Sequence, residues 1–531
     1  MYITEGALKI ALCFRIQHDY ETALDRDWES FSRTGWDVSY LRRKLTVYDE
    51  AAAEYVLRLK DEWTALGEEI QVDGITLDRG FNRNVYAQLF SVGFAHIYEL
   101  HADLREADYS PFAKAEIAAR FMREQDYDLI LCGAWGSIGK TGLFPGALAK
   151  TLGRPFIGSA IDLGMSDKQE VRVQYPAEGG YAEGICALPA VISVGNALHP
   201  YLRASTLRAK MATKGMKAET VEMEFSETER FDTPDPEVLS FERKRARTVE
   251  CTYHDLEEML ALTFAAFHEA AHTEEDAQSQ RVEHCEDPLE LSAQILRYIE
   301  EESPDRILLT ADPVVDQAVI RVCTELSIPC LLDLTQIRPE ERTGVREVYL
   351  GNMYAEFRLP ETLYIATLRP SAGDCVDAGQ EEKIFRGAAA EQEGPMREKH
   401  LIRTESDTED LSEAVRLVAT GNGLARDRVG KLPQLAEHLH AMYGASRPGA
   451  LDKGMPFSKI LGMSGSITAP EHCLVLGVSG MPAFLAGIEN AEHIYAVNTD
   501  EKASIFRVAE HGYVGDCNAF IDRLLEMRTG G

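Results

Sequence analysis

The sequence predicts an α/β protein with largely parallel sheets, and three observations support this prediction. Short apolar runs that read as buried strands alternate with amphipathic stretches of helical period, which is the order of strands joined by crossover helices. Turns rich in Gly, Ser or Asn follow several of these runs. The length of 531 residues exceeds what one hydrophobic core supports, so we expect roughly three or four domains.

The first region, residues 1–222, shows this alternation clearly. We expect a strand, an amphipathic helix, a second strand, a glycine-rich turn and a second helix, in that order, at 9–14, 49–66, 127–132, 133–142 and about 143–152. Two further apolar runs, 171–176 and 188–194, read as strands outside the alternation and close the region.

Residues 223–287 differ in character. They contain acidic and Pro-rich stretches and few strand-forming residues, and only 256–271 shows a helical pattern. We interpret this segment as an acidic, partly helical linker.

Two further α/β regions follow the linker, residues 288–400 and residues 401–531. In the first of them we expect a strand, a helix and a strand at 306–310, 315–326 and 329–332. In the second we expect strands at 415–419, 473–478, 494–497 and 513–514.

The composition restricts the class of protein. Asp and Glu number 87 against 55 Lys and Arg, which gives a net charge of −32. Such a surface repels nucleic acid and anionic lipid, so binding to nucleic acid is disfavoured. An acidic surface is compatible with docking onto basic patches of a protein partner. A solvated acidic surface that keeps the protein soluble explains the charge equally well.

The cysteines and histidines predict no metal site. The ten cysteines form no C-x-x-C pair, so we interpret them as thiols in a reducing compartment. The histidines show no triad or metal spacing, and a hydrolase or metalloenzyme is not indicated. No apolar run reaches the length of a membrane span, and the first residues lack a signal peptide. We therefore expect a cytoplasmic protein without membrane insertion.

Small and polar residues follow the expected strands of the last region. They occur in Gly444-Ala-Ser-Arg447, Gly462-Met-Ser-Gly465, Gly477-Val-Ser-Gly480 and Ala496-Val-Asn-Thr-Asp500. The carboxyl ends of parallel strands meet at one edge of a sheet, where backbone N–H groups bind nucleotides. We therefore expect a nucleotide site at this edge.

In this order the turns resemble the FAD-binding domain of the electron transfer flavoprotein alpha subunit, whose most characteristic tetrapeptide is Gly-Ala-Ser-Arg. Further elements that match it in order are Ile467-x-Ala-Pro470, Leu485-Ala-Gly487, Ile505-Phe506 and Tyr513-Val-x-Asp516. Upstream, Val348-Tyr-Leu-Gly-Asn352 and Ala366-Thr-Leu-Arg-Pro370 resemble two more elements of the same subunit.

The first half resembles the beta subunit of that family. Lys9-Ile-Ala-Leu-Cys13, Val47-Tyr-Asp-Glu50, Asp128-Leu-Ile-Leu-Cys-Gly133 and Leu188-Pro-Ala-Val191 follow in the expected order. The resemblance implies a beta-like half fused to an alpha-like half in one chain. It also implies two to three parallel-sheet nucleotide-binding domains, adenine nucleotide hydrolase-like or Rossmann-like, and a C-terminal FAD-binding α/β domain.

The resemblance implies an electron carrier rather than a catalyst of a substrate reaction. Its FAD would accept electrons from a flavin-containing dehydrogenase, of the acyl-CoA type used in fatty acid oxidation, and pass them to an oxidoreductase such as a quinone reductase. Two alternatives stay open. One is an electron-bifurcating flavoprotein that holds two FAD and oxidises NADH. The other is a flavin-free adenine-nucleotide sensor or scaffold on the same fold.

The resemblance also implies the residues that line the FAD. Arg447 would lie against the isoalloxazine ring, where its planar guanidinium stabilises the negative charge of the reduced flavin. Ser464 stands where the family has a Thr whose hydroxyl donates to flavin N5, and Asp516 matches an adenosine-side carboxylate. The full set is Ser446, Arg447, Met463, Ser464, Gly465, Ser479, Gly480, Phe484, Gly487, Asn498, Asp516 and Asn422.

Several positions depart from the family pattern, among them Ser466, which replaces a Lys, and Ala483, which replaces a Gln. Met463 replaces a Gln, and Phe484 replaces a His that faces flavin O2, so a donor is missing where negative charge develops. We therefore expect a less stabilised anionic semiquinone and a lower potential. Asn422 replaces an Arg of the phosphate contact, which is either lost or taken over by Arg426.

The glycine-rich turn of the first half is a second candidate nucleotide site. Gly139-Lys-Thr141 is placed as in a phosphate-binding P-loop, but Ala134 stands at the first glycine position and no Mg²⁺-holding acidic strand is evident. The beta subunits carry a nucleotide loop here. We rank AMP first, a second FAD next and an ATP-hydrolysing loop last, with a vacant turn also open. The residues concerned are Cys13, Gly133, Lys140, Thr141 and Gly142.

Leu198 is the candidate partner contact. It follows the strand near 188–194 and matches the leucine with which beta subunits anchor a dehydrogenase. An apolar side chain in a surface loop is a plausible hot spot for binding. An ordinary buried Leu is the alternative.

Overall fold

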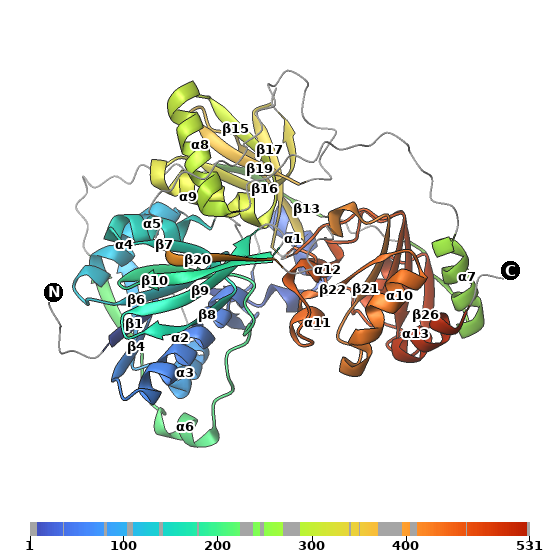
Figure 1. The fold of residues 1–531 in the computed structure, drawn as a ribbon, viewed down its shortest axis with the longest axis horizontal. Helices are drawn as coiled ribbons and strands as arrows, with labels where there is room; N and C mark the ends of the chain where they lie inside the picture. Colours follow the sequence, from blue (N-terminus) through green and yellow to red (C-terminus); the bar gives the residue numbers. More distant parts are fainter. Residues whose placement is uncertain are drawn as a thin grey trace. The chain divides into compact units, whose positions relative to one another are not determined.

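The structure is a computed structural model. It describes residues 8–34, 37–78, 82–102, 110–136, 142–177, 180–223, 237–244, 249–268, 287–338, 341–349, 351–369, 396–403, 411–463 and 465–527. The chain forms two compact units, whose elements Figure 1 labels. The first comprises residues 1–241, 282–348 and 355–403, and the second comprises 242–281, 349–354 and 404–531.

The first unit is built on a seven-stranded parallel sheet of order β12-β5-β4-β1-β6-β11-β7. Its strands are β1 (Leu8–Cys13), β4 (Ile70–Thr76), β5 (His96–Ala102), β6 (Leu129–Gly133), β7 (Phe156–Ala160), β11 (Ala190–Val194) and β12 (Glu219–Met223). Its helices are α2 (Val47–Ala65), α3 (Arg83–Val92), α4 (Pro111–Arg123) and α5 (Leu143–Leu152).

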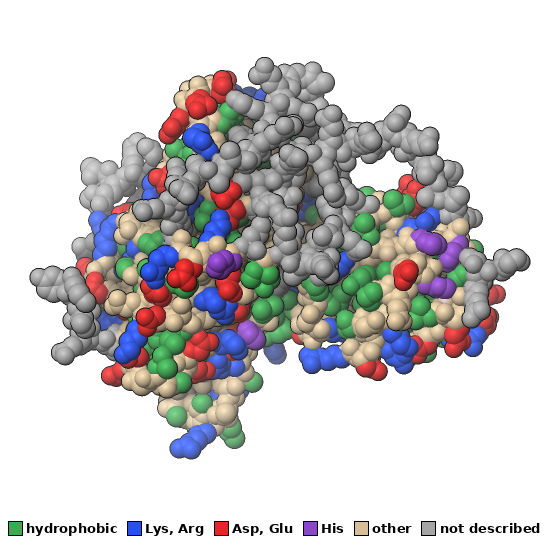
Figure 2. Space-filling view, in the orientation of Figure 1, with side chains coloured by type: hydrophobic (Ala, Val, Ile, Leu, Met, Phe, Trp, Pro, Cys, Tyr) green, Lys and Arg blue, Asp and Glu red, His purple; other side chains and the backbone are tan. Residues whose placement is uncertain are grey.

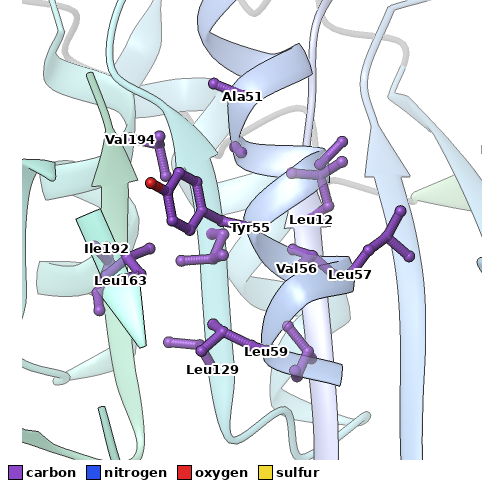
Figure 3. Packing of buried hydrophobic residues seen from close by; sticks show 14 of the residues in the cluster. Leu12, Ala51, Tyr55, Val56, Leu57, Leu59, Leu129, Leu163, Ile192 and Val194 are labelled. Atoms are coloured by element: carbon purple, nitrogen blue, oxygen red, sulfur yellow. The ribbon is translucent and has the colours of Figure 1, made fainter. Parts of the chain in front are cut away.

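Alternate residues of each buried strand face opposite helix layers, as the period of two in a strand requires. Ile10 and Leu12 pack with α2 and α3, whereas Ala11 and Cys13 pack with α4 and α5. Figure 3 shows the first of these layers around Tyr55 of α2. Both faces of the sheet are therefore covered, and only its edges and strand ends are available to ligands.

Three smaller groups of strands complete the first unit. β8 (Asp162–Asp167), β9 (Glu170–Ala177), β10 (Gly180–Ala187) and β20 (Met396–Arg403) form an antiparallel sheet. A six-stranded mixed sheet contains β13 (Val238–Arg243), β15 (Arg306–Thr310), β16 (Cys330–Arg338), β17 (Thr343–Val348), β18 (Met353–Arg358) and β19 (Tyr364–Leu368), with α8 (Pro288–Glu302) and α9 (Pro313–Leu326). A ribbon of β2 (Ile16–His18) and β3 (Arg43–Leu45), α1 (Asp25–Thr34) and α6 (Leu207–Ala212) are peripheral.

The second unit contains a parallel sheet of order β14-β26-β25-β24-β21-β22-β23. Its strands are β14 (Thr252–Tyr253), β21 (Arg416–Thr420), β22 (Met442–Ser446), β23 (Ile460–Leu461), β24 (His472–Leu476), β25 (His493–Asn498) and β26 (His511–Val514). Its helices are α7 (Leu256–His268), α10 (Leu432–His438), α11 (Arg447–Leu451), α12 (Pro482–Leu485) and α13 (Cys517–Glu526).

The predicted α/β class with several parallel sheets is confirmed. The helix expected at 143–152 and the strand expected at 306–310 have these bounds in the structure. The predicted linker departs from expectation, because it supplies β13 and β14 to two different sheets. Within the described ranges, no helix combines the length and the apolarity needed to cross a membrane.

Candidate functional site

The strand order of the second unit creates a switch point between β21 and β24. From β21 the chain runs outward through β22 and β23, then returns to β24 and runs the other way through β25 and β26. Loops after neighbouring strands diverge at such a point, and ligands bind in the crevice between them. The loops here are Gly421–Gly423 and Gly477–Gly480.

Glycines let the two loops at the switch point touch. A Cβ at Gly421 would lie 2.5 Å from the carbonyl oxygen of Gly477, and one at Gly423 would lie 2.8 Å from the Cα of Gly477. Gly477 itself has a φ of +65°, in the left-handed region that favours glycine. Gly423 N donates to Gly477 O at 3.0 Å. The two loops therefore meet backbone to backbone, and Asn422 between the glycines is exposed.

Ser446 and Arg447 lie where β22 passes into α11. The hydroxyl of Ser446 caps the helix by accepting from Gly449 N at 3.3 Å. Gly449 in turn approaches the loop after β21, since its Cβ would lie 3.1 Å from Gly421 C. Arg447 is half-buried at the start of the helix. The structure thus places the predicted flavin arginine next to the switch point.

Met463 and Gly465 follow β23, and Met463 contacts α12. Met463 N donates to Ala483 O at 2.8 Å, and Gly465 N donates to Gly462 O at 2.9 Å. A Cβ at Gly487 would lie 2.3 Å from Gly462 N, so the two segments meet backbone to backbone. Ser464 lies outside the described residues.

Phe484 lies in a hydrophobic cluster below these loops. Its exposure is 5%, and the cluster also contains Leu461, Val478 and Ile505. The apolar side chain therefore secures α12 on the sheet. Its predicted place in the cofactor lining stays a prediction.

Ser479, Gly480 and Asn498 line the next part of the edge. Gly480 has a φ of +82°, and its Cβ would lie 2.3 Å from Ile505 N. Asn498 Nδ2 donates to Val478 O at 2.7 Å, and its Oδ1 accepts from Asp500 N at 2.9 Å. Asn498 thus holds neighbouring loops together, while Ser479 is exposed and available to a ligand.

Asp516 ends the row at β26. It is exposed and caps α13, where its Oδ1 accepts from Asn518 N at 3.0 Å and from Asn518 Nδ2 at 2.9 Å. The backbone and side-chain N–H groups of Asn518 hold the pKa of Asp516 below its ordinary value. Asn518 Nδ2 also donates to Gly423 O at 3.1 Å, which ties the helix to the switch-point loop.

Two cations near the switch point differ in what they contact. Arg426 Nη2 donates to Asp452 O, away from the loop glycines. Lys453 Nζ donates to Gly421 O at 3.2 Å, and burial lowers the pKa of Lys453. Sequence reasoning missed Lys453, because no motif includes it and only the fold brings it to Gly421.

The first sheet presents the second candidate site at its own carboxyl edge. Cys13 pairs in register with Cys132 at the ends of β1 and β6, and burial together with the Cys132 thiol raises the pKa of Cys13. Gly133 N donates to Asp49 Oδ1 at 2.9 Å. Asp49 is 1% exposed and forms an ion pair with Arg15 at 3.1 Å.

Gly142 begins α5 beside Trp135. It has a φ of +62°, and a Cβ there would lie 2.9 Å from Trp135 Nε1. Lys140 and Thr141 lie outside the described residues. In the described part of this edge, Asp49 binds Gly133 N and pairs with Arg15. The nucleotide predicted at this edge stays a prediction.

Leu198 is exposed, and α6 carries further exposed apolar side chains that sequence reasoning missed. Its exposed fraction is 51%, against 78% for Leu207 and 64% for Met211 of α6. Apolar and basic side chains occur together over α6 (Figures 1 and 2). Alternation of Leu, Arg, Lys and Met across 207–211 was the signal that could have identified this surface.

Two family models match the chain. The model described as electron transfer flavoprotein domain matches residues 38–226 and 275–398. The model described as electron transfer flavoprotein FAD-binding domain matches residues 410–489. The second match contains the switch point, the loops after β22 and β23, and α12.

Curated relatives agree with these matches. The electron transfer flavoprotein alpha subunit of Paracoccus denitrificans is 32% identical, over 38% of this chain and 66% of the relative. That of Bacillus subtilis is 27% identical, over 44% of this chain and 74% of the relative. A subunit of the lactate dehydrogenase (NAD(+),ferredoxin) of Acetobacterium woodii is 29% identical, over 44% of this chain and 58% of the relative. Each match covers only part of the relative's length.

Proposed function

Because this chain belongs to the electron transfer flavoprotein family, we propose that it is an electron carrier in which a beta-like and an alpha-like half are fused. The fusion is supported by the order of the matches. One family model matches two separate segments, 38–226 and 275–398, ahead of the FAD-binding domain match at 410–489. The observation that carries the proposal is the carboxyl edge of the second sheet, where Arg447, Ser479, Asn498 and Asp516 lie at or just after the ends of β22, β24, β25 and β26.

The residues of this edge fit a flavin dinucleotide. The loops after β21 and β24 meet through their backbones, Arg447 follows β22, and the Asp516 carboxylate follows β26. When bound, FAD supplies exchange of one or two electrons. Arg447 would supply fixed positive charge toward the ring, which raises the potential by charge pairing. Asp516 would accept hydrogen bonds from the ribose hydroxyls, and Ser479 would donate to the polar middle of the dinucleotide.

The chain's residues position the cofactor and need not transfer protons themselves. Phe484 and its cluster keep the loops around the ring rigid, because a buried aromatic side chain cannot move without opening a cavity. The lack of the family's histidine at this position supports a lower potential than relatives that keep it. The positions of the loop groups around the flavin affect its reduction potential.

The proposed donor is a flavin-containing dehydrogenase of the acyl-CoA type, and the proposed acceptor is a quinone-reducing or other oxidoreductase. The exposed side chains of Leu198 and, on α6, of Leu207 and Met211 support docking of one such partner. Large apolar side chains in the open are typical of protein-binding surfaces. Arg208 and Lys210, on the same helix, favour an acidic partner.

The absorbance spectrum of the purified chain and the cofactors released from it test the proposal. We expect a yellow protein with one FAD per chain, and a colourless protein would contradict the proposal. AMP at the first sheet's edge stays a prediction, which the same release experiment checks.

Replacing Arg447 tests its role directly. Arg447→Ala should lower the flavin potential or empty the site. Arg447→Lys keeps the charge, so its potential and flavin content should lie between those of the unaltered protein and of Arg447→Ala. A variant Arg447→Ala with unchanged flavin content and unchanged potential would refute the role. Spectroelectrochemical titration of each variant measures both quantities.

A bifurcating flavoprotein is the second candidate, and one relative favours it. The Acetobacterium woodii protein is named as a subunit of a lactate dehydrogenase that uses NAD(+) and ferredoxin. Two FAD released per chain, with NADH reducing one of them, would support this alternative. A single FAD that NADH does not reduce supports the simple carrier.

A further inference from the structure

Histidines are concentrated in the second unit, around the segment formed by β14 and α7. The whole sequence contains 14 histidines. Half of them make ring contacts in this unit, and Figure 2 shows histidine side chains gathered in this part of the molecule. They are His254, His268, His438, His440, His472, His493 and His511. Histidine changes its charge between about pH 5 and about pH 8, so this concentration points to a response to pH.

Two of these histidines join β14 to β26. His254 Nε2 lies 3.0 Å from His511 Nδ1, and the ring centroids are 5.1 Å apart. One of the two nitrogens donates a hydrogen, and the other must accept it with a free lone pair. A first added proton is compatible with this contact, because a charged ring still donates to a neutral one. A second added proton would place two N–H groups face to face, so the rings would have to separate.

The surrounding charges do little to offset a second proton. Glu258 Oε2 lies 3.6 Å from His254 Nδ1, but the Glu258 side chain is 64% exposed, so water screens it. The other ionisable groups that face the pair are Tyr495 and His493 of β25, Glu510 and Tyr513 beside His511, Tyr253 of β14, Glu501 and Lys502 of the loop after β25, and Glu257 of α7, which pairs with Arg523 of α13. Burial first, and the nearby His254 second, lower the pKa of His511 in the folded protein.

The backbone ties the histidine contact to the attachment of β14. β14 is two residues long and lies at the edge of the sheet. Thr252 N donates to Glu510 O at 2.9 Å, and His254 N donates to Gly512 O at 2.9 Å. His254 is thus bound to β26 through both its backbone and its ring. Separation of the rings therefore strains the few hydrogen bonds that hold the strand.

α7 follows β14 and has histidine contacts at its far end. In Figure 1, α7 lies beside α13 and β26. His268 is the last residue of α7, and its ring centroid lies 6.0 Å from that of His438 and 5.4 Å from that of His440. Phe267, one residue earlier, contacts the ring of His472 at 5.9 Å. Protonation of these rings adds like charges at short range, so both ends of the segment lose stability as the pH falls.

We propose that β14 and α7 form an acid-sensitive latch on the second unit, which opens when His254 and His511 are both protonated. The open latch binds one proton more than the closed one, so below about pH 6.5 the equilibrium should shift toward opening by about tenfold per pH unit. β26 ends at Val514, shortly before Asp516, so an open latch would loosen the edge of the sheet that carries this residue. The latch is independent of the proposed function, because it involves no bound FAD.

Hydrogen–deuterium exchange of the full-length protein at about pH 7.5, 6.5 and 5.5 tests the latch. Mass spectrometry reads peptides of α7 and of β24, and the rates are corrected for the intrinsic dependence of amide exchange on pH. The protection of α7 should fall roughly tenfold between about pH 6.5 and about pH 5.5, whereas β24, in the middle of the same sheet, should keep its protection. His254→Gln and His511→Gln keep a side chain that can hydrogen-bond but that takes up no proton, so each should largely abolish the fall.

His199→Gln is the matched control. His199 lies in the first unit and burial lowers its pKa as well, so its replacement should leave the fall in α7 protection unchanged. The proposal is overturned if α7 of the unaltered protein keeps its protection at about pH 5.5, or if β24 loses protection in parallel, because the whole unit then unfolds. It is also overturned if both glutamine variants show the same fall as the unaltered protein. A variant whose α7 is already unprotected at about pH 7.5, with β24 still protected, supports the histidine pair as the contact that closes the latch.

Discussion

Asp516 carries two roles that substitutions can separate. Its Oδ1 caps α13 by accepting from Asn518 N at 3.0 Å, and we propose that the same carboxylate binds the ribose of FAD. Asp516→Asn keeps an oxygen acceptor at the cap, because Asn is as good an N-cap as Asp, but it removes the charge. Asp516→Ala removes both the cap and the charge.

The expected magnitudes differ between the two measurements. Loss of the cap should lower the free energy of unfolding by about 1 kcal/mol in Asp516→Ala and hardly at all in Asp516→Asn. Loss of a hydrogen bond to a charged group costs about 1.5–3 kcal/mol, so Asp516→Ala should weaken FAD binding roughly 10- to 150-fold. Asp516→Asn replaces a charge-assisted hydrogen bond with a neutral one about half as strong, so a loss of roughly fivefold is expected.

Urea unfolding of the flavin-free variants and FAD titration provide the two readouts. Asp312→Ala is the control, since Asp312 caps α9 in the first unit and its loss should leave FAD binding unchanged. The reasoning is refuted if both variants at Asp516 bind FAD as the unaltered protein does. Weakened binding in Asp516→Ala alone would assign the effect to the helix cap and not to the charge.

Two further predictions concern stability. Arg369 is 4% exposed and pairs with Asp333 at 2.7 Å and Glu347 at 3.0 Å. Arg369→Leu removes the cation from two buried carboxylates, so urea unfolding should show a free energy of unfolding of the first unit that is lower by about 3–5 kcal/mol. Arg358→Leu, at an exposed ion pair, should cost less than about 1 kcal/mol, and equal losses would contradict the argument. Burial and neighbouring histidines lower the pKa of His511 in the folded protein from its ordinary 6.5. The unfolded chain therefore binds the extra proton at a higher pH than the folded protein does. The stability of the second unit should fall as the pH drops below about 6.5. His511→Gln should make this fall shallower in urea unfolding at about pH 7.5 and about pH 5.5, and an unchanged slope would count against the assignment.

The sequence predicted strands and helices where local chemistry determines them. Residues 306–310 are an apolar run between a helix and a turn, and the structure has a strand with those bounds. β13 was missed because its residues are largely exposed and show no alternation of apolar residues. β20 was missed because it is defined by pairing with β10, more than 200 residues earlier in the chain. Pairing at such a distance leaves no local signal for a pattern to detect.

The candidate site, too, was predictable from the sequence only in part. Turn residues predicted the carboxyl edge, and the structure places the described ones among them at the strand ends. Their hydrogen bonds could not be predicted, because they depend on the folded geometry. The side-chain amide of Asn498, for example, donates to Val478 O and accepts from Asp500 N. Lys453 belongs to no motif, and only the fold brings it to Gly421.

The pairing of β20 with β10 has a consequence for how the chain could be divided. Residues 396–403 return to close the open side of a hairpin made by residues 170–187, so a fragment that stopped after residue 222 would expose a row of unpaired backbone groups. Such a fragment would expose a surface prone to self-association, and a cut in the intervening segment would leave two pieces still held together by a shared sheet. Residues 170–187 and 396–403 are thus joined by backbone hydrogen bonds of one sheet as well as by the covalent chain.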